Sequence, residues 1–559
     1  MKKRIFAALA LITLFACAES SVEPNKQLPE PEPKPEPVYD CIQESNVTKN
    51  ETTLVAITIP SKDIAIDPMI YGQMLEDCND KVIYGGVVNN EGEENMAVTE
   101  LLRPLNIPVM RWPAGTAIYT YEWKKGIGKE RTPGYDYWGG NGKEYYTFGT
   151  DEFITWCERL NIEPYINLPM NLDPYKNRST YDHSFENALA WIEYVNGDVT
   201  TPYGAQRAEN GHPEPYGVKL WCIGNENYYP HAYHTPEPAE FYAKNLAEWA
   251  KKFKKLYPDL SLLGVGRTPD WTKVILEESG EYIDYVTIHY YIQSYIDKNN
   301  LLTEPHKGLF TSALVEANLK QNIEVLKAAN AKLGREANPI RFSVDEWNHR
   351  HKPETSAWNT DRKDDRRQYD VITTSTMLNV FLRNAPYVGM ANYIFPVNGH
   401  GLLKTVGEND AYRTAAYYVF ELYRKYLVGD LMGVYVEGAG HPMVRLGDYA
   451  WLDGDVAADT KTIVQDLCFV DAVATMNDNG DICIALSNRS HDKSQKVQLD
   501  LPDGYSVAEV WSLESQDIKA VNTAANRNVV QPKLIENSGT ALSLLPCGLK
   551  IVKCIANQQ

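Results

Sequence analysis

The chain has 559 residues with 55 Lys and Arg against 74 Asp and Glu, a net charge of −19. Because such a chain is repelled by nucleic acids and by anionic lipid surfaces, we expect neither as a partner. Its nine cysteines form no CxxC pair and no metal-ligand spacing. Cys157 and Cys222 lie in apolar periodic segments and are predicted to be buried thiols, whereas Cys547 with Cys554, or Cys468 with Cys483, remain open as disulfides.

The N-terminus has the pattern of an export signal over residues 1–17. Lys2, Lys3 and Arg4 precede an apolar run that is shorter than the roughly 20 residues of a membrane span. The segment from Leu14 to Cys17 resembles a bacterial lipoprotein cleavage box, in which Cys17 would carry the lipid. An ordinary cleaved signal peptide is the alternative.

A spacer is predicted at residues 18–50. Its sequence EPNKQLPEPEPKPEPV is rich in Pro and Glu, which favours an extended and solvated chain. We interpret it as a tether between an anchor and a catalytic body. Because no later apolar run is long enough to span a bilayer, we expect an exported protein held at the bacterial cell envelope, in the periplasm or at the cell surface, only by its lipid anchor.

Residues 65–428 alternate short apolar strands with segments of helical period. Repeated βα units of this number predict a (β/α)₈ TIM barrel, whose active site lies at the carboxyl ends of the strands. The eight predicted strands begin at Ile70, Ile107, Glu163, Val218, Ser261, Ile283, Arg341 and Met390.

The pattern changes to short alternating segments with turn signals over residues 429–559. The stretch MNDNGDICIALSN predicts a hairpin around Asn479-Gly480. We therefore predict a C-terminal all-β sandwich. The isolated strand within residues 51–64 has no βα partner, and we expect it to join this sandwich.

Two carboxylates end predicted strands of the barrel. Glu226, in WCIGNENYY, follows the fourth strand, and Glu346, in RFSVDEW, ends the seventh. Either one alone is a weak signal, since an acidic residue at a strand end is usually just solvated. Facing each other across a barrel mouth, they would supply the acid/base group and the nucleophile of a glycosidase.

Other polar and aromatic side chains at the strand ends are predicted to bind substrate. They are Arg111, Asn225, His289, Tyr291 and Trp347. An amide at position 225 can hold a sugar hydroxyl, and the ring of Trp347 offers an apolar face. For Arg111 two interpretations remain open, a cation that binds substrate or one that pairs with a carboxylate and keeps it ionised. For Tyr291 two interpretations remain open, a hydroxyl that donates to Glu346 or a ring packed in the barrel wall.

Four histidines raise the question of a metal site. His231 and His234 form an HxxH pair, and His349 and His351 form an HxH pair. Neither pair has a carboxylate at a standard ligand spacing, so no metal is predicted. No cofactor is expected either, since two carboxylates can supply the acid, the base and the nucleophile.

Seven motifs resemble those of glycoside hydrolase family 51, the α-L-arabinofuranosidases, in their order. They are YGQMLEDCNDKVIYGG, VMRWPAG, YEWKKGIG, FGTDEF, NGHPEPYGVKLWCIGNEN, IHYY and DEWN, which run through nearly the whole barrel. The resemblance implies a retaining mechanism with Glu226 as acid/base and Glu346 as nucleophile. It also implies that Asn225 and Glu76 bind the arabinose, and that Tyr291 and Trp347 line the same subsite. Retaining enzymes hold their two carboxyl groups about 5–5.5 Å apart.

The chain departs from the family pattern close to these motifs. Asp77 follows Glu76 where His is usual, Thr116 replaces a Cys, and Phe395 replaces a Gln that often reaches the site. The loop after Glu226 also lacks its usual Trp and Gly. The catalytic pair is untouched, so these departures concern the identity of the sugar rather than hydrolysis.

The predicted function is that of a retaining, exo-acting α-L-arabinofuranosidase acting on arabinan, arabinoxylan or oligosaccharides derived from them. A homo-oligomer is a further expectation from the resemblance. One alternative is an endo-acting β-1,4-glucanase or xylanase, which needs an open cleft rather than a pocket closed by the loop at Glu122–Asn141. The other is a non-catalytic surface lipoprotein that binds glycans, which would have no need for both carboxylates.

Overall fold

The computed structural model describes residues 41–557 except 79–80, 90, 139–142, 145, 173–180, 231–234, 354–364, 450–457 and 536–538. The predicted signal peptide, Cys17 and the Pro/Glu-rich stretch lie outside the described residues. Within the described part of the chain, no helix has both the length and the apolar character needed to cross a lipid bilayer.

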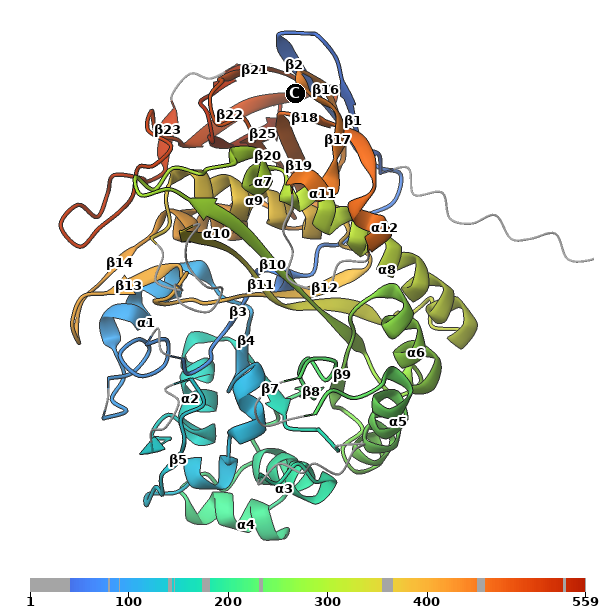
Figure 1. The fold of residues 1–559 in the computed structure, drawn as a ribbon, viewed down its shortest axis with the longest axis vertical. Helices are drawn as coiled ribbons and strands as arrows, with labels where there is room; N and C mark the ends of the chain where they lie inside the picture. The colour runs from blue at the N-terminus through green and yellow to red at the C-terminus, as the bar shows by residue number, and fades with distance from the viewer. Residues whose placement is uncertain are drawn as a thin grey trace, which may run out of the picture. The chain divides into compact units, whose positions relative to one another are not determined.

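Eight parallel strands close into a barrel, which confirms the predicted fold class (Figure 1). In chain order they are β3 (Gly72–Met74), β4 (Val109–Trp112), β7 (Glu163–Leu168), β8 (Leu220–Ile223), β9 (Ser261–Val265), β10 (Tyr285–Ile296), β11 (Arg341–Pro353) and β12 (Val388–Tyr393). Each pairs with the next, and β12 pairs with β3 to close the ring. Strands buried on both faces carry nearly continuous apolar runs, which is why they were legible in the sequence.

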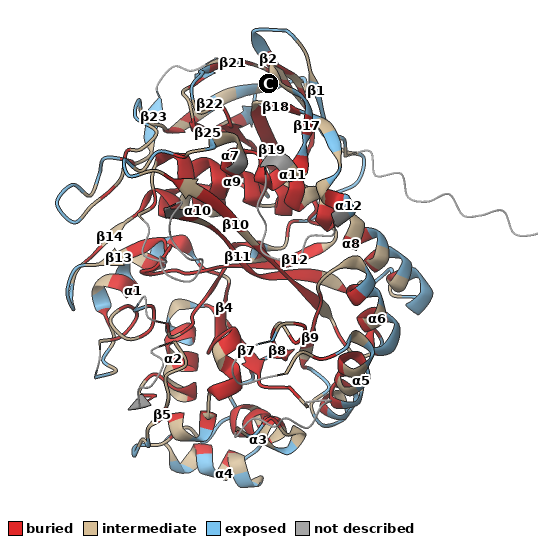
Figure 2. Ribbon diagram, viewed as in Figure 1, coloured by how far each residue is buried: buried red, intermediate tan, exposed pale blue. Residues whose placement is uncertain are grey.

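Helices surround the barrel, and they carry both buried and exposed residues (Figure 2). The longer ones are α1 (Met96–Leu102), α2 (Thr150–Leu160), α3 (Phe185–Asn196), α4 (Pro202–Glu209), α5 (Ala239–Leu256), α6 (Pro269–Ser279), α8 (Thr311–Leu333), α9 (Gln368–Arg383) and α10 (Ala415–Tyr426). On α5, Tyr242, Leu246, Trp249 and Phe253 form the buried stripe. Such a stripe fixes which face of the helix packs on the strands.

Short elements complete the barrel half. They are the 3₁₀ turns η1 (Pro68–Tyr71), η2 (Arg103–Leu105), η3 (Thr116–Thr120) and η4 (Trp123–Gly126), the helix α7 (Pro305–Leu309), and the strand pairs β5 (Gly134–Tyr135) with β6 (Lys143–Glu144) and β13 (Leu403–Thr405) with β14 (Ala411–Arg413). The turn η3 follows the carboxyl end of β4, so it lies at the mouth of the barrel.

Two further sheets form the predicted sandwich. One has the order β1–β16–β2–β21–β24 and the other β15–β19–β20–β25–β22–β23. Their bounds are β1 (Gln43–Val47), β2 (Thr52–Thr58), β15 (Asp430–Leu431), β16 (Gly433–Gly438), β19 (Val470–Met476), β20 (Ile482–Asn488), β21 (Gln495–Asp500), β22 (Tyr505–Leu513), β23 (Lys533–Ile535), β24 (Ala541–Leu544) and β25 (Leu549–Ala556). Beside them lie β17 (Gly440–Arg445), β18 (Val464–Cys468), α11 (Leu446–Tyr449) and α12 (Ala458–Lys461). The hairpin predicted at Asn479-Gly480 joins β19 to β20, with Gly480 at φ +78°.

The first strand differs from the expectation for its residues. Strand β1 falls inside the stretch predicted as a spacer, yet it pairs in parallel with β16, from Gln43 opposite Val434 to Val47 opposite Gly438. Three of its five residues are exposed, so it has no apolar face that a sequence pattern can reveal. Backbone hydrogen bonding to a sheet edge, rather than side-chain burial, holds it in place.

Helix α9 lies between the barrel and the sandwich, and its residues from Gln368 to Leu382 are all buried. The Gln368 side-chain amide donates to the carbonyl oxygens of Leu513 and Cys547 at 3.1 and 2.8 Å. A helix buried on every side is the mark of a central element. The barrel and the sandwich therefore share α9 as part of one continuous packing arrangement.

The eight cysteines among the described residues are free thiols, so neither pair left open by the sequence is bonded in the structure. Cys157 and Cys222 are buried, as predicted. Burial raises the pKa of Cys222 to about 12. A thiol with so high a pKa is unreactive at neutral pH.

Leu378 tests the central place of α9. It is fully buried on that helix, and replacing a buried Leu by Ala costs roughly 2–5 kcal/mol. We expect Leu378→Ala to lower the midpoint of thermal unfolding by several degrees. The matched control is Leu256→Ala at the exposed end of α5, where the side chain is 55% exposed and the change should stay within about 0.5 kcal/mol. Equal shifts in the two variants would contradict this account of α9.

Candidate active site

The turn that carries Glu226 directly follows β8 and departs from ordinary backbone geometry. Gly224 has φ +100° and Glu226 has φ +44°, and a non-glycine residue in this region costs about 1–2 kcal/mol. Tyr119 of η3 holds the turn from one side. Its hydroxyl accepts from the Asn225 N–H at 2.9 Å and donates to the Asn225 carbonyl oxygen at 2.7 Å. The Asn227 amide donates to the Met170 carbonyl at 2.8 Å on the other side.

Glu346 lies on β11 with its side chain 7% exposed and both carboxylate oxygens occupied. Arg111 Nη1 donates to Oε1 at 2.7 Å, and the hydroxyl of Tyr291 donates to Oε2. Of the two interpretations left open for Tyr291, the structure therefore shows the hydroxyl donor. Burial, followed by the charge of Glu346, raises the pKa of Tyr291 well above its usual value. The phenol thus remains a donor at working pH.

The guanidinium of Arg111 connects the two halves of the site. It is fully buried on β4, and its Nη2 donates to Asn225 Oδ1 at 2.6 Å while its Nε lies 3.2 Å from Asp345 Oδ2. Burial works against the charged form, but the carboxylates of Asp345 and Glu346 outweigh it and raise the pKa of Arg111 well above its usual value. One permanent cation therefore orients Glu346 and the neighbour of Glu226 together.

His289 on β10 lies among three carboxylates. Its Nδ1 is 2.8 Å from Glu226 Oε1 and 3.6 Å from Glu346 Oε2, and its Nε2 is 3.2 Å from Asp345 Oδ1. Burial disfavours the imidazolium, yet Glu346, Asp345 and the hydrogen bond to Glu226 raise the pKa of His289 well above 6.5. The ring is therefore a cation at neutral pH.

Arg111 and His289 bring two positive charges to this cluster. Burial raises the pKa of Asp345, but Arg111 and His289 outweigh it and lower that pKa below its usual value. The two cations thus face the carboxyl groups of Asp345, Glu346 and Glu226. Because unbalanced buried charge is costly, two cations among three carboxyl groups favour one bound proton in this cluster.

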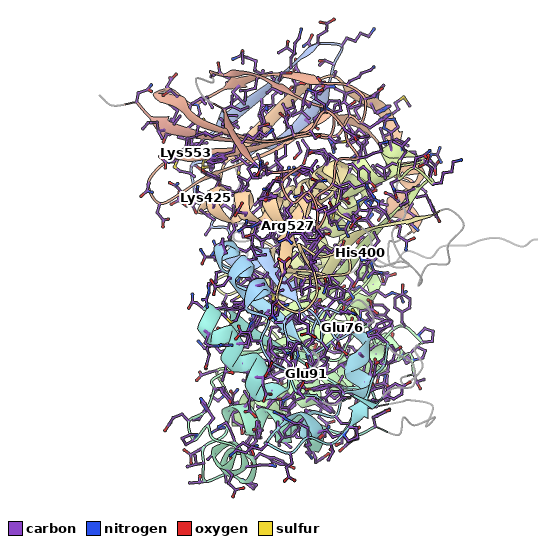
Figure 3. All side chains as sticks on the ribbon, turned by 90° about the vertical axis from the view of Figure 1, so that its left-hand side faces the viewer. Glu76, Glu91, His400, Lys425, Arg527 and Lys553 are labelled. Carbon is purple, nitrogen blue, oxygen red and sulfur yellow. The ribbon has the colours of Figure 1, made fainter. Side chains whose placement is uncertain are left out.

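Glu76 follows β3 and lies in the same mouth; Figure 3 shows it among the side chains of the barrel half. It is 5% exposed, and its Oε1 accepts from the backbone N–H groups of Gly115 and Ala117 at 3.1 and 3.4 Å. Gly115 also approaches Glu346 closely, since a Cβ at this position would lie 2.5 Å from Glu346 Oε1. Glycine at position 115 thus lets the two carboxylates share one small space.

Trp347 is not brought together with these residues. Its ring is 1% exposed and packs edge-on against Phe381 and Tyr393, and stacked on Phe420, with centroids 4.9–5.9 Å apart. Phe381 and Phe420 belong to α9 and α10, on the helix side of the barrel wall. Side chains of successive strand residues point to opposite faces. With Glu346 facing the mouth, Trp347 faces away from it.

Asp345 was not singled out from the sequence, although it contacts more of the site than Trp347 does. It accepts from the Tyr165 hydroxyl at 2.8 Å and pairs with Arg111 and His289. Register shifts in the pairing of β11 with both neighbours let Asp345 and Glu346, which are adjacent, reach the same guanidinium. The signal available in the sequence was a second acidic residue inside a strand with no solvent-facing side.

Two groups of three side chains among the described residues could hold a metal ion, and His231 and His234 lie outside those residues. One group is His349, His351 and Asp370, whose carboxylate comes from α9 and not from a nearby sequence position. Arg366 Nη1 and His351 Nε2 already occupy Asp370 Oδ1 at 3.0 and 2.5 Å. A metal ion would have to displace this guanidinium, so the group is better described as a buried ion-pair network.

The second group is Glu226, His289 and Glu346, with ligand atoms within 4.8 Å of one another. These side chains already contact one another, with His289 Nδ1 2.8 Å from Glu226 Oε1 and 3.6 Å from Glu346 Oε2. The same spacing brings one oxygen of Glu226 within 4.8 Å of one oxygen of Glu346. These atoms are therefore positioned for acid–base and nucleophilic chemistry on one substrate atom.

The positions that depart from the family pattern lie beside the cluster. Asp77 helps to line a small cavity of about 40 Å³ with aromatic walls that include Tyr84, Tyr121 and Tyr137. Thr116 and Phe395 are 8% and 2% exposed. The hydrogen bonds to Glu346 come from Arg111 and Tyr291.

Two family models match the chain at consecutive places. The α-L-arabinofuranosidase 1 domain matches residues 101–305, and the α-L-arabinofuranosidase C-terminal domain matches residues 345–544. The chain belongs to glycoside hydrolase family 51. The first model carries Glu226 and His289, and the second begins at Asp345 and carries Glu346. The two halves of the cluster thus come from the two matched regions of this family 51 protein.

Named relatives and a solved structure agree with the family. A probable α-L-arabinofuranosidase C of Aspergillus niger is 29% identical over 83% of this chain and 90% of its own. The intracellular exo-α-(1→5)-L-arabinofuranosidase 1 of Bacillus subtilis is 26% identical over the same shares. The structure of a thermostable family 51 α-L-arabinofuranosidase from Thermotoga petrophila has a TM-score of 0.74 at 25% identity, covering 90% of this chain and 100% of that one.

Gly115→Ala tests the close approach of backbone and Glu346. The added methyl group would lie 2.5 Å from Glu346 Oε1 and 3.3 Å from Met74 Cε, so the carboxylate has to move away from Arg111. Because small misplacements of a reacting group cost about 10²-fold in rate, we expect kcat to fall by that order. The matched control is Met74→Leu combined with Gly115→Ala. It changes the side chain at Met74 but leaves the clash with Glu346, so kcat should stay as low as in Gly115→Ala alone. Unchanged kcat in Gly115→Ala would contradict the geometry.

Two histidines of this family 51 protein, His289 and His349, should have pKa values shifted in opposite directions. His289 should remain charged at pH 8, and His349, whose pKa is lowered well below 6.5 by burial and then by His351, should remain neutral at pH 6. Since the folded pKa of His289 is raised, its contribution to stability is complete below about 6.5 and is lost as pH rises through the folded value. Nitrogen-15 spectra of histidine-labelled protein, recorded from pH 5 to 9, measure both rings. A neutral His289 at pH 7 would contradict the charge balance.

Proposed function

We propose that the protein is a retaining, exo-acting α-L-arabinofuranosidase that releases arabinofuranosyl groups from plant polysaccharides or oligosaccharides. The observation that carries the proposal is the approach of Glu226 and Glu346 to within 4.8 Å, on either side of the His289 cation. Family membership and the names of the relatives from Aspergillus niger and Bacillus subtilis support the sugar. Retention, exo action and the individual residue roles rest on the chemistry argued below.

The spacing of the two carboxyl groups favours a retaining mechanism. Inverting enzymes separate them by about 6.5–9.5 Å to leave room for a water molecule, whereas retaining enzymes hold them at about 5–5.5 Å. The nearest oxygens of Glu226 and Glu346 lie within 4.8 Å of each other, which is nearer to the retaining spacing than to the inverting one. Direct attack by Glu346 is the step that such a geometry supports.

In the first step, Glu346 attacks the anomeric carbon and the bond from that carbon to the glycosidic oxygen breaks. Glu226 gives its proton to the departing oxygen, so the leaving group departs as an alcohol and a covalent glycosyl ester forms on Glu346. Arg111 and Tyr291 hold the attacking carboxylate by its two oxygens before the reaction. As charge leaves Glu346, it develops on Glu226, next to the imidazolium of His289.

In the second step, Glu226 is a carboxylate and takes a proton from a water molecule. The resulting hydroxide attacks the anomeric carbon, the ester to Glu346 breaks, and both carboxyl groups return to their starting states. Two inversions at one carbon give net retention. In this proposal Asn225, whose side chain Arg111 holds at 2.6 Å, and Glu76 bind hydroxyl groups of the arabinose ring.

We also propose that the mature protein is exported and anchored through Cys17, and that it forms a homo-oligomer. The support for export and lipidation is the leader sequence with its cleavage box and the Pro/Glu-rich stretch that follows it. The oligomer rests on the family resemblance. Mass spectrometry of the mature N-terminus and light scattering of the purified protein test these two points separately.

Aryl glycosides test the proposed roles of the two carboxylates. We expect 4-nitrophenyl α-L-arabinofuranoside to be hydrolysed by the wild type and the rate with Glu346→Ala to fall to background. Glu226→Ala should lose far less on this substrate, because nitrophenolate leaves without a proton, but about 10²–10⁴-fold on arabino-oligosaccharides, whose leaving groups need one. Added azide should speed up Glu226→Ala by replacing water in the second step.

Three outcomes would contradict the proposal. Hydrolysis of only the β-D-xyloside or β-D-glucoside would overturn the sugar, and proton NMR showing first release of β-L-arabinose would overturn retention. Long oligosaccharides as first products from linear arabinan would overturn exo action. Asp345→Asn is the control with which Glu346→Ala and Glu226→Ala are compared. It removes one carboxylate charge from the cluster but keeps both reacting groups, so it separates the effect of charge from the loss of a reacting group.

A further inference from the structure

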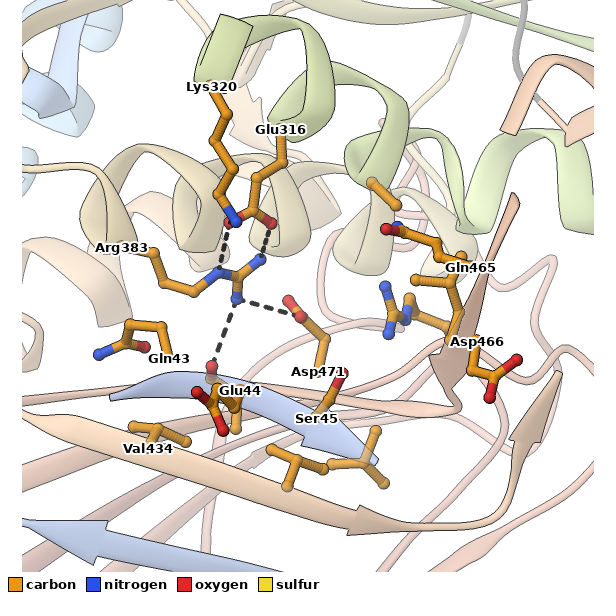
Figure 4. Close-up of a pocket in the computed structure, with 16 residues that line it drawn as sticks. Gln43, Glu44, Ser45, Glu316, Lys320, Arg383, Val434, Gln465, Asp466 and Asp471 are labelled. Atoms are coloured by element: carbon orange, nitrogen blue, oxygen red, sulfur yellow. Dashed lines mark hydrogen bonds and ion pairs between the residues drawn. The ribbon is translucent and has the colours of Figure 1, made fainter. Parts of the chain in front are cut away.

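A second cavity lies between the barrel helices and the sandwich, and neither Glu226 nor Glu346 is among the residues that line it. Its volume is about 370 Å³, within the range of small-molecule sites. Helices α8 and α9 form one wall, and β1, β18 and β19 form the other. We call it the seam cavity. Figure 4 shows Glu316 and Lys320 reaching into it from α8, with Gln43, Glu44 and Ser45 on the opposite strand.

The carboxylates deepest in the seam cavity are already paired. Arg383 Nη2 donates to Glu316 Oε2 at 2.9 Å and its Nη1 donates to Asp471 Oδ1 at 3.0 Å (Figure 4). Lys320 Nζ lies 3.3 Å from Glu316 Oε1, and the Asn379 amide donates to Asp471 Oδ2 at 2.7 Å. Two cations and two anions therefore cancel, and these side chains need no ligand to satisfy them.

Arg489 is a further cation in this cavity, and it has no ion pair of its own among the described residues. It is 5% exposed. Its Nε and Nη2 both donate to the Cys468 carbonyl, at 3.1 and 2.6 Å, and the guanidinium carbon lies 5.0 Å from the centroid of the Phe310 ring. Within the described part of the chain, Nη1 has no acceptor. A buried guanidinium in this state favours the approach of an anion.

We propose that the seam cavity binds a sugar acid, with its carboxylate on Arg489 and its hydroxyls toward the rim. A neutral sugar would leave the buried cation unpaired, and a small inorganic anion would leave most of the volume unfilled. The exposed carboxylates of Glu44 and Asp466 at the rim can accept from the hydroxyls. They also repel a second negative charge, so a single uronic acid fits better than a polyuronate.

The ligand can come from two sources with this same chemistry. It is either a free sugar acid or a lone uronic acid residue attached to a neutral polysaccharide. The site is independent of the proposed hydrolysis, because its lining includes neither catalytic carboxylate. Failure of one proposal therefore leaves the other intact.

The test is titration calorimetry of the full mature chain with D-galacturonate, D-galactose, inorganic phosphate and a xylo-oligosaccharide bearing one glucuronic acid. We expect galacturonate to bind at least 10-fold more tightly than galactose or phosphate. Tight binding of the oligosaccharide as well would assign the site to a polysaccharide residue, and binding of the monosaccharide alone would assign it to a free sugar acid. Binding should be the same in Glu346→Ala, and galacturonate should not inhibit hydrolysis of the aryl arabinofuranoside.

Variants connect this binding to the seam cavity. Arg489→Gln should weaken galacturonate at least 10-fold. Arg103→Gln, a partly exposed arginine on the barrel half, is the matched control and should bind as the wild type. Since Arg489 is buried, its replacement can impair folding. Ser45→Trp narrows the cavity from an exposed position on β1 and should abolish binding with the thermal unfolding midpoint unchanged.

Several results would overturn the proposal. These are equal affinity for galacturonate and galactose, phosphate binding as tightly as galacturonate, no binding of either acid, or wild-type affinity in folded Ser45→Trp. Loss of binding in Glu346→Ala would place the ligand at the catalytic carboxylates and would overturn it too.

Discussion

The buried guanidinium of Arg111 is the contact on which the site depends. From β4 it reaches Glu346 and Asp345 on β11 and the side chain of Asn225 after β8 at once. A fully buried cation is tolerated only where such partners surround it, since desolvation of a lone charge costs several kcal/mol. Strand register, the turn after β8 and the bulges of β11 must therefore all be correct for this one side chain to be satisfied. The folding of the barrel and the correct geometry of the site therefore depend on the same contacts of Arg111.

The same electrostatic requirement explains why the site holds more carboxylates than a glycosidase needs. Asp345 has no place in the bond-making steps, yet without it the cations Arg111 and His289 would face Glu346 alone. It lies 3.2 Å from each of them and so allows Glu346 to remain reactive beside two positive charges. His289 in turn gives Glu226 a cation next to which it can become negative during the reaction. Glu226 and Glu346 thus depend on Asp345 and His289, which form no bond to the substrate but set the electrostatic potential at the two reacting groups.

The elements that could be predicted from the sequence are those that are held in place by the burial of apolar side chains. Buried parallel strands leave apolar runs, and their ends located Glu226 and Glu346. The sequence did not predict contacts made by the backbone or between distant elements. Strand β1 is held by an edge it shares with β16, Asp370 meets His351 from a different helix, and Trp347 was expected on the face that Glu346 occupies. Asp345 was not singled out, and a local bulge is what brings it to the same guanidinium as Glu346.

The pairing of β2 has a consequence for how the chain folds. Thr52 lies opposite Lys496, a separation of 496 − 52 = 444 residues, and at roughly 5–20 residues per second the ribosome needs about 20–90 s to make that much chain. The whole barrel is therefore synthesised before β2 meets β21. Until then the apolar face of β2, with Val55 and Ile57, has no permanent partner sheet. The order of synthesis makes the sandwich the last part whose strands are all available for pairing.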